Sequence, residues 1–162
     1  MIVLGVDPGL SGAIASYDGT TLMVEDMPTI QFKGTKKMKT RIVLTELADM
    51  MQVQFDGADH AYIEEVSAMP GQGVTSMFNF GTSFGIIQMA VAMIGVPITM
   101  VSPMKWKMEM GLNSDAEKSR NRALQLFPNS VEKFKRKMDH NRAEAALIAW
   151  YGYKMLTVGR VR

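Results

Sequence analysis

Short apolar runs separated by turn residues organise the first third of the chain. Residues 2–6 form an apolar run that ends at Asp7 and a Pro-Gly pair, as expected of a buried strand entering a turn. Residues 13–17 and 21–24 predict two further strands, because the Asp-Gly pair at 18–19 is a common hairpin signal. The first third is therefore predicted to be an antiparallel meander.

The pattern then changes to helical spacing. Residues 32–39 contain Gly34 and several lysines without an apolar period, which predicts an exposed loop. Residues 40–55 predict a helix, because their apolar positions recur every three to four residues. Those positions are Leu44, Leu47, Ala48, Met51 and Phe55.

The second half alternates strands with helices. Residues 60–66 predict a strand that ends in two glutamates, and residues 97–101 predict another. Between them, residues 74–94 predict a long helix despite Gly81 and Gly85. This helix contains too many small and polar residues to span a membrane.

A capping signal marks the next helix. Ser114 begins a Ser-Asp-Ala-Glu segment that matches the capping box, so a helix is predicted over residues 115–126, and the apolar residues at 143–150 indicate a last one. This order of elements predicts a mixed α/β sheet flanked by helices. We expect residues 1–162 to form a single domain, because 162 residues suffice for one core.

Composition limits the chemistry that is possible. The chain has no cysteine, so disulfides and cysteine-based zinc sites are excluded, and His60 and His140 alone make no convincing zinc site. A metal would have to bind oxygen or histidine ligands. The apolar run at the N-terminus is too short for a secretory signal, so we expect a cytoplasmic protein.

Three carboxylates lie at positions where catalytic residues are often found. Asp7 and Glu64 follow buried strands, and strand ends in open α/β sheets are where ligands bind. Glu144 lies on the last helix, where Asn141 and His140 share its face. Plain structural roles remain open: Asp7 as a turn residue, Glu64 in a salt bridge.

Asp139 has a structural alternative as well, because it could cap the last helix. Oxygen ligands without cysteine suit Mg²⁺ or Mn²⁺. Two such ions about 4 Å apart can activate water and stabilise the leaving oxygen in phosphodiester cleavage. An acidic metal cluster therefore ranks above a zinc hydrolase or a Ser11 nucleophile, for which no base is evident.

Four motifs occur in an order that resembles the RuvC family of Holliday junction resolvases, particularly its short phage-type members. They are Gly-Val-Asp-Pro-Gly at 5–9, Ile-Glu-Glu-Val at 63–66, Ser-Asp-Ala-Glu-Lys-Ser at 114–119 and Arg-Ala-Glu-Ala-Ala-Leu-Ile-Ala at 142–149. The resemblance implies an RNase H-like (retroviral-integrase-like) fold with a central five-stranded sheet. It also implies a homodimer with two active sites that nicks four-way DNA junctions symmetrically with Mg²⁺, in a bacterial or phage-infected cell.

The resemblance also implies roles for individual residues. Asp7, Glu64 and Glu144 match family acids, but Asn141 stands where the family has another acid. Either Asp139 supplies the missing carboxylate, or Asn141 is an inactivating substitution, or metal binding is weaker. We favour Asp139, so the expected catalytic residues are Asp7, Glu64, Asp139 and Glu144, with Asn141 as an additional metal ligand.

Basic residues provide the expected DNA contacts. The net charge of +2 is too small to indicate a nucleic-acid partner, but two runs of cations could bind phosphates without reading sequence. The expected DNA-binding residues are Lys33, Lys36, Lys37, Lys39, Arg41, Lys105, Lys107, Lys118, Lys135, Arg136, Lys137 and Arg142.

Two further features depend on the long helix. It is similar to the segment through which these enzymes dimerise, and some relatives insert an aromatic side chain beside the mid-chain glutamate. Here Ser67, Ala68 and Met69 occupy that place, so Phe78 or Phe80 would have to stack on bases. Apolar residues available for dimer contact are Met77, Phe78, Phe84, Met89 and Met93.

Two other functions remain possible. A junction-binding protein that does not cut would keep the basic surfaces, and Asn141 would mark its lost activity. An actin-like or sugar-kinase-like ATPase also begins with a strand and an Asp-x-Gly turn. That fold needs two lobes, and 162 residues have room for one.

Overall fold

A five-stranded mixed sheet forms the centre of the molecule. The structure is a computed structural model, and it describes residues 1–34, 38–67 and 71–158. The strands are β1 (Val3–Asp7), β2 (Ala13–Tyr17), β3 (Leu22–Asp26), β6 (His60–Glu64) and β7 (Ile98–Val101). Their order across the sheet is β3-β2-β1-β6-β7; β1, β2 and β3 pair antiparallel, and β6 pairs parallel with both β1 and β7. The predicted meander and the five-stranded sheet are confirmed.

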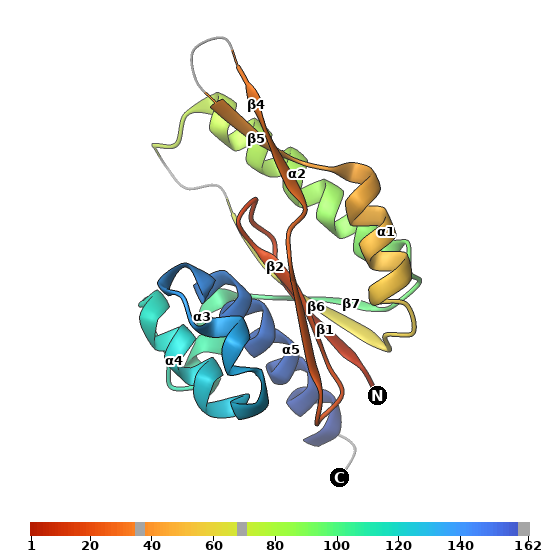
Figure 1. Cartoon of the computed structure of the whole chain (residues 1–162), viewed down its shortest axis with the longest axis vertical. Helices are drawn as coiled ribbons and strands as arrows, with labels where there is room; N and C mark the ends of the chain where they lie inside the picture. Colours follow the sequence, from red (N-terminus) through yellow and green to blue (C-terminus); the bar gives the residue numbers. More distant parts are fainter. Residues whose placement is uncertain (35–37, 68–70, 159–162) are drawn as a thin grey trace.

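Helices cover both faces of this sheet (Figure 1). α1 (Leu44–Gln54) and α2 (Val74–Ala92) lie on one face. α5 (His140–Val158) lies on the other, together with α3 (Pro103–Glu109) and α4 (Ala116–Leu126). The predicted α/β class, a mixed sheet flanked by helices, is therefore confirmed.

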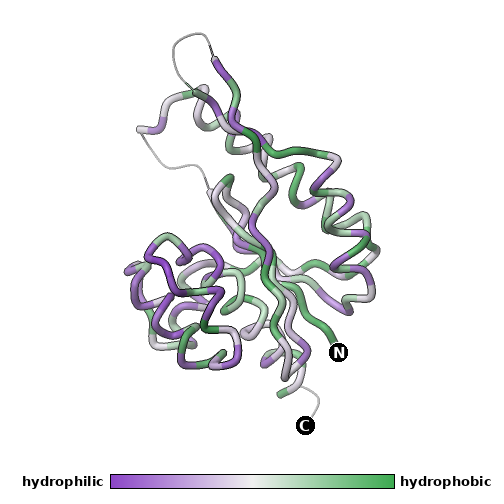
Figure 2. Tube along the Cα trace, viewed as in Figure 1, coloured by the Kyte–Doolittle hydropathy of each residue, from purple (hydrophilic) through white to green (hydrophobic). Residues whose placement is uncertain are grey.

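Alternation along the strands separates two hydrophobic cores. Val3 packs against the α5 side, whereas Leu4 and Val6 pack on the side of α1 and α2. Because both faces are covered, β1 is apolar at consecutive positions, and Figure 2 shows this central strand in the hydrophobic colour. Trp106, Phe134 and Leu147 are among the largest buried side chains on the α5 side.

The backbones of β1 and α5 approach each other closely at Gly5. A Cβ atom at this position would overlap the backbone nitrogen of Ala149 and the backbone oxygen of Ala145. Only a glycine allows this packing, since it has no side chain. The contact fixes the first turns of α5 beside the carboxyl end of β1.

The prediction of an exposed loop over residues 32–39 was wrong. β4 (Thr29–Lys33) and β5 (Met38–Ile42) pair as an antiparallel two-stranded sheet. Only Ile42 at its base is buried, so neither face produced the alternation that marks a half-buried strand. Lys36 and Lys37 lie outside the described residues.

Three smaller expectations also need correction. The first helix begins at Leu44, not at residue 40, because residues 40–42 belong to β5. α4 is capped by Asp115, whose carboxylate accepts from the Glu117 N–H, and not by Ser114. α3 was missed because it has only seven residues; Ser102 caps it and Pro103 opens it.

Two short 3-10 helices, η1 (Pro128–Phe134) and η2 (Lys137–Asp139), connect α4 to α5 and were not predicted either. Among the described helices, none combines the length and the apolar character that crossing a membrane requires.

Candidate active site

Asp7 and Glu64 end neighbouring strands at the same level. In the parallel pair of β1 and β6, Val6 lies opposite Ile63, so the next residues, Asp7 and Glu64, lie side by side about 5 Å apart along the sheet. Their side chains alternate away from Val6 and Ile63, which pack toward α1 and α2. Both carboxylates therefore belong to the face that α5 covers.

Glu144 reaches this place from α5. It directly precedes Ala145, whose backbone oxygen lies against Gly5, and Gly5 is two residues before Asp7 in β1. The charges of Glu64 and Glu144 both raise the pKa of Asp7. The structure thus brings together three of the predicted site residues, one each from β1, β6 and α5.

Asp7 has a strongly perturbed acidity. Burial is the main cause that raises its pKa from 3.8 to about 8, and the neighbouring charges of Glu64 and Glu144 add to the effect. The charge of Lys107 acts in the opposite direction but does not compensate. Without further positive charge, the folded protein therefore holds a proton on Asp7 at neutral pH.

Glu64 is buried and held by a tryptophan. Burial raises its pKa, and the charge of Glu144 adds to this. The indole Nε1–H of Trp106 donates to Glu64 Oε1 at 2.9 Å and opposes the shift, because it stabilises the ionised carboxylate. Trp106 is itself fully buried, so this hydrogen bond fixes the orientation of the carboxylate.

Glu144 is held by a lysine and a serine. The Lys107 ammonium contacts Glu144 Oε1 at 2.8 Å, and the Ser119 hydroxyl donates to the same oxygen at 3.0 Å. Ser119 is fully buried in α4. Lys107 was predicted to contact DNA, but in the structure it lies within the carboxylate cluster.

Three carboxylates and one ammonium leave this cluster short of positive charge. This imbalance adds to burial in raising the pKa of Asp7. Carboxylate oxygens are the ligands that Mg²⁺ and Mn²⁺ prefer. In the described part of the chain, however, no group of three or more Asp, Glu, His or Cys side chains is arranged to hold a metal ion. The donor types therefore fit a divalent cation, whereas their present geometry, with Glu144 turned to Lys107, does not enclose one.

Asp139 belongs to a different ion-pair group. Its buried carboxylate accepts from the guanidinium and the backbone N–H of Arg136 and also faces Arg142. Burial alone would raise the pKa of Asp139, but these partners outweigh burial and hold the pKa below its usual range. Asp139 closes the turn of η2 rather than the first turn of α5, so its interpretation as the cap of the last helix was wrong.

Asn141 contacts the loop that follows β1. Its side-chain Nδ2 donates to the backbone oxygen of Ser11 at 2.7 Å. Ser11 lies between Asp7 and the start of β2, so Asn141 connects α5 to the loop beside Asp7. Position 141 therefore lies on the same side of the sheet edge as the cluster, one helical turn before Glu144.

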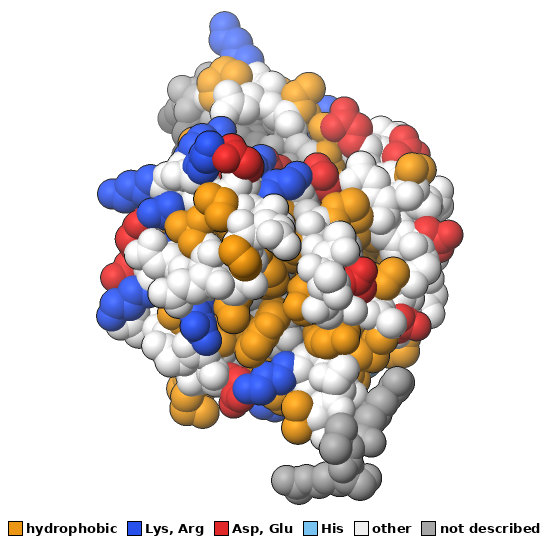
Figure 3. Space-filling model, turned by 60° about the horizontal axis from the view of Figure 1, so that its bottom comes forward, with side chains coloured by type: hydrophobic (Ala, Val, Ile, Leu, Met, Phe, Trp, Pro, Cys, Tyr) orange, Lys and Arg blue, Asp and Glu red, His pale blue; other side chains and the backbone are white. Residues whose placement is uncertain are grey.

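The predicted DNA-binding cations divide into free-standing and paired groups. Arg142 forms a two-pronged ion pair with Asp26, and Lys135 pairs with Glu132 on the surface. Figure 3 shows Lys and Arg side chains gathered toward the side of α4, whereas Asp and Glu side chains lie mainly on the α1 side. The exposed cations among the described residues are Lys33, Lys39, Arg41, Lys105, Lys118, Lys135, Arg136 and Lys137.

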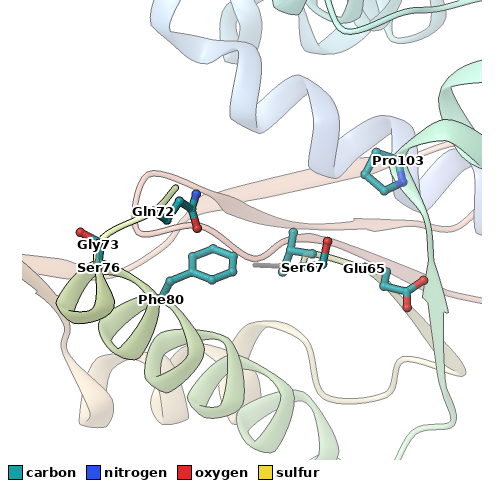
Figure 4. A pocket seen from close by; sticks show the side chains of 8 residues that line it. Glu65, Ser67, Gln72, Gly73, Ser76, Phe80 and Pro103 are labelled. Atoms are coloured by element: carbon teal, nitrogen blue, oxygen red, sulfur yellow. The ribbon is translucent and has the colours of Figure 1, made fainter. Parts of the chain in front are cut away.

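A cavity of about 710 Å³ opens beyond the end of β6. Glu65 and Ser67, which follow β6, and Pro103 at the start of α3 line one end of it. Figure 4 shows the ring of Phe80, from α2, pointing into the space toward Ser67. Of the two phenylalanines considered for base stacking, Phe80 therefore faces a cavity, whereas Phe78 is 72% exposed on α2. Ala68 and Met69 lie outside the described residues.

Trp106 and Ser119 were not predicted as partners of the carboxylates. Ser119 belongs to a motif that carried the resemblance, so that motif could have indicated it. Nothing around Trp106 suggested that an indole would meet a strand 42 residues away. Such a contact depends on how α3 packs, and α3 itself was not predicted.

Comparisons with known proteins agree with this architecture. No protein-family model and no curated protein matches the sequence. Among solved structures, Thermus thermophilus RuvC in complex with a Holliday junction substrate matches with a TM-score of 0.61 at 13% identity, over 96% of each chain.

A second structure of Thermus thermophilus RuvC matches with a TM-score of 0.58 at 16% identity, over 97% of this chain and 98% of that one. The yeast mitochondrial Holliday junction resolvase Ydc2 matches with a TM-score of 0.51 at 14% identity, over 94% of this chain and 78% of that one. These structural matches show a shared fold, in agreement with the predicted RNase H-like arrangement.

Proposed function

We propose that this chain, which has the fold of the RuvC resolvases, is an endonuclease that cuts four-way DNA junctions with the help of divalent cations. The observation that carries the proposal is the meeting of Asp7, Glu64 and Glu144 at one sheet edge. Such a cluster suits phosphodiester hydrolysis because cations bound there can activate water and stabilise the leaving oxygen.

The residues around the cluster would prepare it for cations. Asp7 and Glu64 are fixed by the strands, and Trp106 orients Glu64. Lys107 neutralises Glu144 and would have to release it, wholly or in part, for Glu144 to serve as a ligand. Ser119 holds Glu144 near its present position meanwhile. Ionisation of Asp7 is the proton loss that a bound cation would favour.

The fourth ligand is a choice between two residues. Asp139 remains a prediction for this role, although Arg136 and Arg142 already engage its carboxylate. Asn141 is the alternative, since it lies one helical turn before Glu144 and has an amide oxygen. Asn141→Asp should increase cleavage if position 141 is a ligand, and Asp139→Asn should reduce cleavage without changing junction binding if Asp139 is.

The decisive test is a cleavage assay on a synthetic four-way junction, with a linear duplex of the same sequence as control. Mg²⁺ or Mn²⁺ should support nicking of the junction in preference to the duplex, and EDTA should stop it. Asp7→Asn and Glu64→Gln should abolish nicking while leaving junction binding intact or tighter. Normal cutting by both variants would show that the cluster is not the active site.

Two matched nicks in one junction require two active sites, so we also propose a homodimer. α2 presents large apolar side chains to solvent, among them Phe78 (72% exposed) and Met89 (62% exposed). An exposed apolar helix face of this kind is typical of a protein interface. Sedimentation velocity should give a dimer for the unmodified chain and a monomer for Phe78→Glu.

The same assays address the other functions. Junction binding without cutting at any cation concentration would favour a protein that has lost catalysis, and an active Asn141→Asp variant would support that view. ATP hydrolysis without nicking would favour the ATPase. We further infer that the chain acts as one nuclease domain on DNA in the cytoplasm of a bacterial or phage-infected cell.

A further inference from the structure

Apart from Ile42 at its base, the hairpin of β4 and β5 lies outside the two cores. Apart from their contact with each other, β4 and β5 have no extensive contact with another described helix or strand. Figure 1 shows the hairpin projecting from the body of the molecule, beyond the end of the sheet where β1 turns into β2. A two-stranded sheet is marginally stable when both faces are in water. We therefore expect a binding partner to cover at least one face of this hairpin.

The register of the strands assigns its side chains to two faces. Phe32 lies opposite Lys39 and Ile30 opposite Arg41, so these four side chains share one face. On that face the Arg41 guanidinium lies over the Phe32 ring, 5.1 Å from its centre. Lys33 points to the opposite face. The hairpin thus carries cations on both faces, and apolar side chains lie between them.

The partner must be negatively charged on two sides. The sequence contains no Asp or Glu from residue 27 to residue 45, so no acid within the hairpin neutralises its cations. A flat acidic surface would use only one face. The major groove of duplex DNA has phosphates along both walls, is about 12 Å wide and admits a two-stranded ribbon.

The base of the hairpin lies at the candidate active site. Asp7 pairs with Ala13, and Ala13 pairs with Asp26, so Asp26 is at the same level of the sheet, two strand spacings or about 10 Å away. β4 begins three residues after Asp26 and extends for five residues, or about 17 Å. DNA cut at Asp7 would therefore have one of its arms within reach of the hairpin.

We propose that the β4–β5 hairpin enters the major groove of a duplex arm next to the cutting site, with Lys39 and Arg41 on one wall and Lys33 on the other. This inference rests on the proposed function, because it requires DNA at the carboxylate cluster. Contact with the Phe32 ring restricts the Arg41 guanidinium in advance, so Arg41 would meet the phosphates with less loss of side-chain freedom.

The test is the salt dependence of junction binding, measured in EDTA by fluorescence anisotropy between about 50 and 200 mM NaCl. Each phosphate contact adds about 0.9 to the slope of log affinity against log salt. Arg41→Ala and Lys33→Ala should therefore each reduce the slope by about 0.9, although they lie on opposite faces. Lys39→Ala/Arg41→Ala should reduce it by about 1.8.

Lys154→Ala is the matched control, because Lys154 is a partly exposed cation on α5 about 15 Å along the helix from Glu144. Its slope should equal that of the unmodified protein. Thermal unfolding should be unchanged for Lys33→Ala and Arg41→Ala, since both side chains are exposed.

The possible failures are distinguishable. If the unmodified protein cuts junctions but the hairpin substitutions leave the slope unchanged, this inference is overturned and the proposed function stands. A loss confined to one face overturns groove insertion, and a change in sedimentation coefficient would instead assign the hairpin to contact with a second copy. If the unmodified protein binds no DNA, both proposals fail.

Discussion

Replacing Asp7 by asparagine should remove most of the loss of stability that the folded protein suffers between pH 5 and pH 7. Burial and neighbouring carboxylates raise the folded-state pKa of Asp7 from 3.8 to about 8. Between these values the folded chain keeps the proton and the unfolded chain releases it. The stabilisation is therefore complete below about pH 4 and is lost as pH rises through about 8.

The size of the effect follows from proton linkage. Within this window each pH unit costs about 1.4 kcal/mol, so the step from pH 5 to pH 7 should cost the unmodified protein about 2.7 kcal/mol. The side chain that Asp7→Asn introduces does not titrate. With a urea m-value of about 1–3 kcal/mol/M, the midpoint of the unmodified protein should fall by about 1–3 M relative to the variant.

Urea unfolding in EDTA, followed by circular dichroism at several pH values, measures this difference. Asp18→Asn is a suitable control, because hydrogen bonds from the backbone of Thr21 and Thr20 lower the pKa of Asp18. That carboxylate is ionised in both states between pH 5 and pH 7, so its removal should leave the pH dependence unchanged. Parallel curves for Asp7→Asn and the unmodified protein would show that Asp7 is ionised in the folded state and that the argument from burial is wrong.

Two further substitutions test the supports of the site. Gly5→Ala should destabilise the protein by about 3 kcal/mol or more and abolish nicking, because its Cβ would overlap the backbone of α5. Gly81→Ala is the control: a Cβ there meets nothing, so it should stabilise the protein by about 0.4–1 kcal/mol in thermal unfolding. Equal effects of the two substitutions on stability would refute the close approach of β1 and α5. Trp106→Phe should cost about 1–3 kcal/mol by removing a hydrogen bond to a carboxylate. It should also move the pH profile of nicking upward, because that bond lowers the pKa of Glu64; an unchanged profile would show that the bond does not matter for ionisation.

Much of the sheet could be predicted from sequence because its inner strands are mostly buried. β1, β2 and β6 gave apolar runs with turn signals, and the predicted boundaries were close to those found. The β4–β5 hairpin was missed for the opposite reason: with both faces in solvent, nothing in the pattern separated it from a loop. Short helices such as α3 give too few turns for a period to appear.

The candidate site was predictable where it depends on single residues at strand ends. Asp7 and Glu64 follow buried strands, and Glu144 lies on a helix that the Gly5 contact brings to them. The partners of these acids could not be predicted, because Trp106 and Lys107 reach the cluster through tertiary packing. The ion pair of Asp139 with Arg136 could not be predicted from sequence either, because it depends on how the chain folds between α4 and α5.

The backbone contact between Gly5 and α5 bears on how this scaffold could be redesigned. Because main chain touches main chain, the separation of the strand-borne and helix-borne acids does not depend on which rotamers the rest of the core adopts. An engineer could therefore exchange side chains at the far end of α5, around Tyr153 and Leu156, and retain the spacing of the acids. A single methyl group at position 5 would alter that spacing at once.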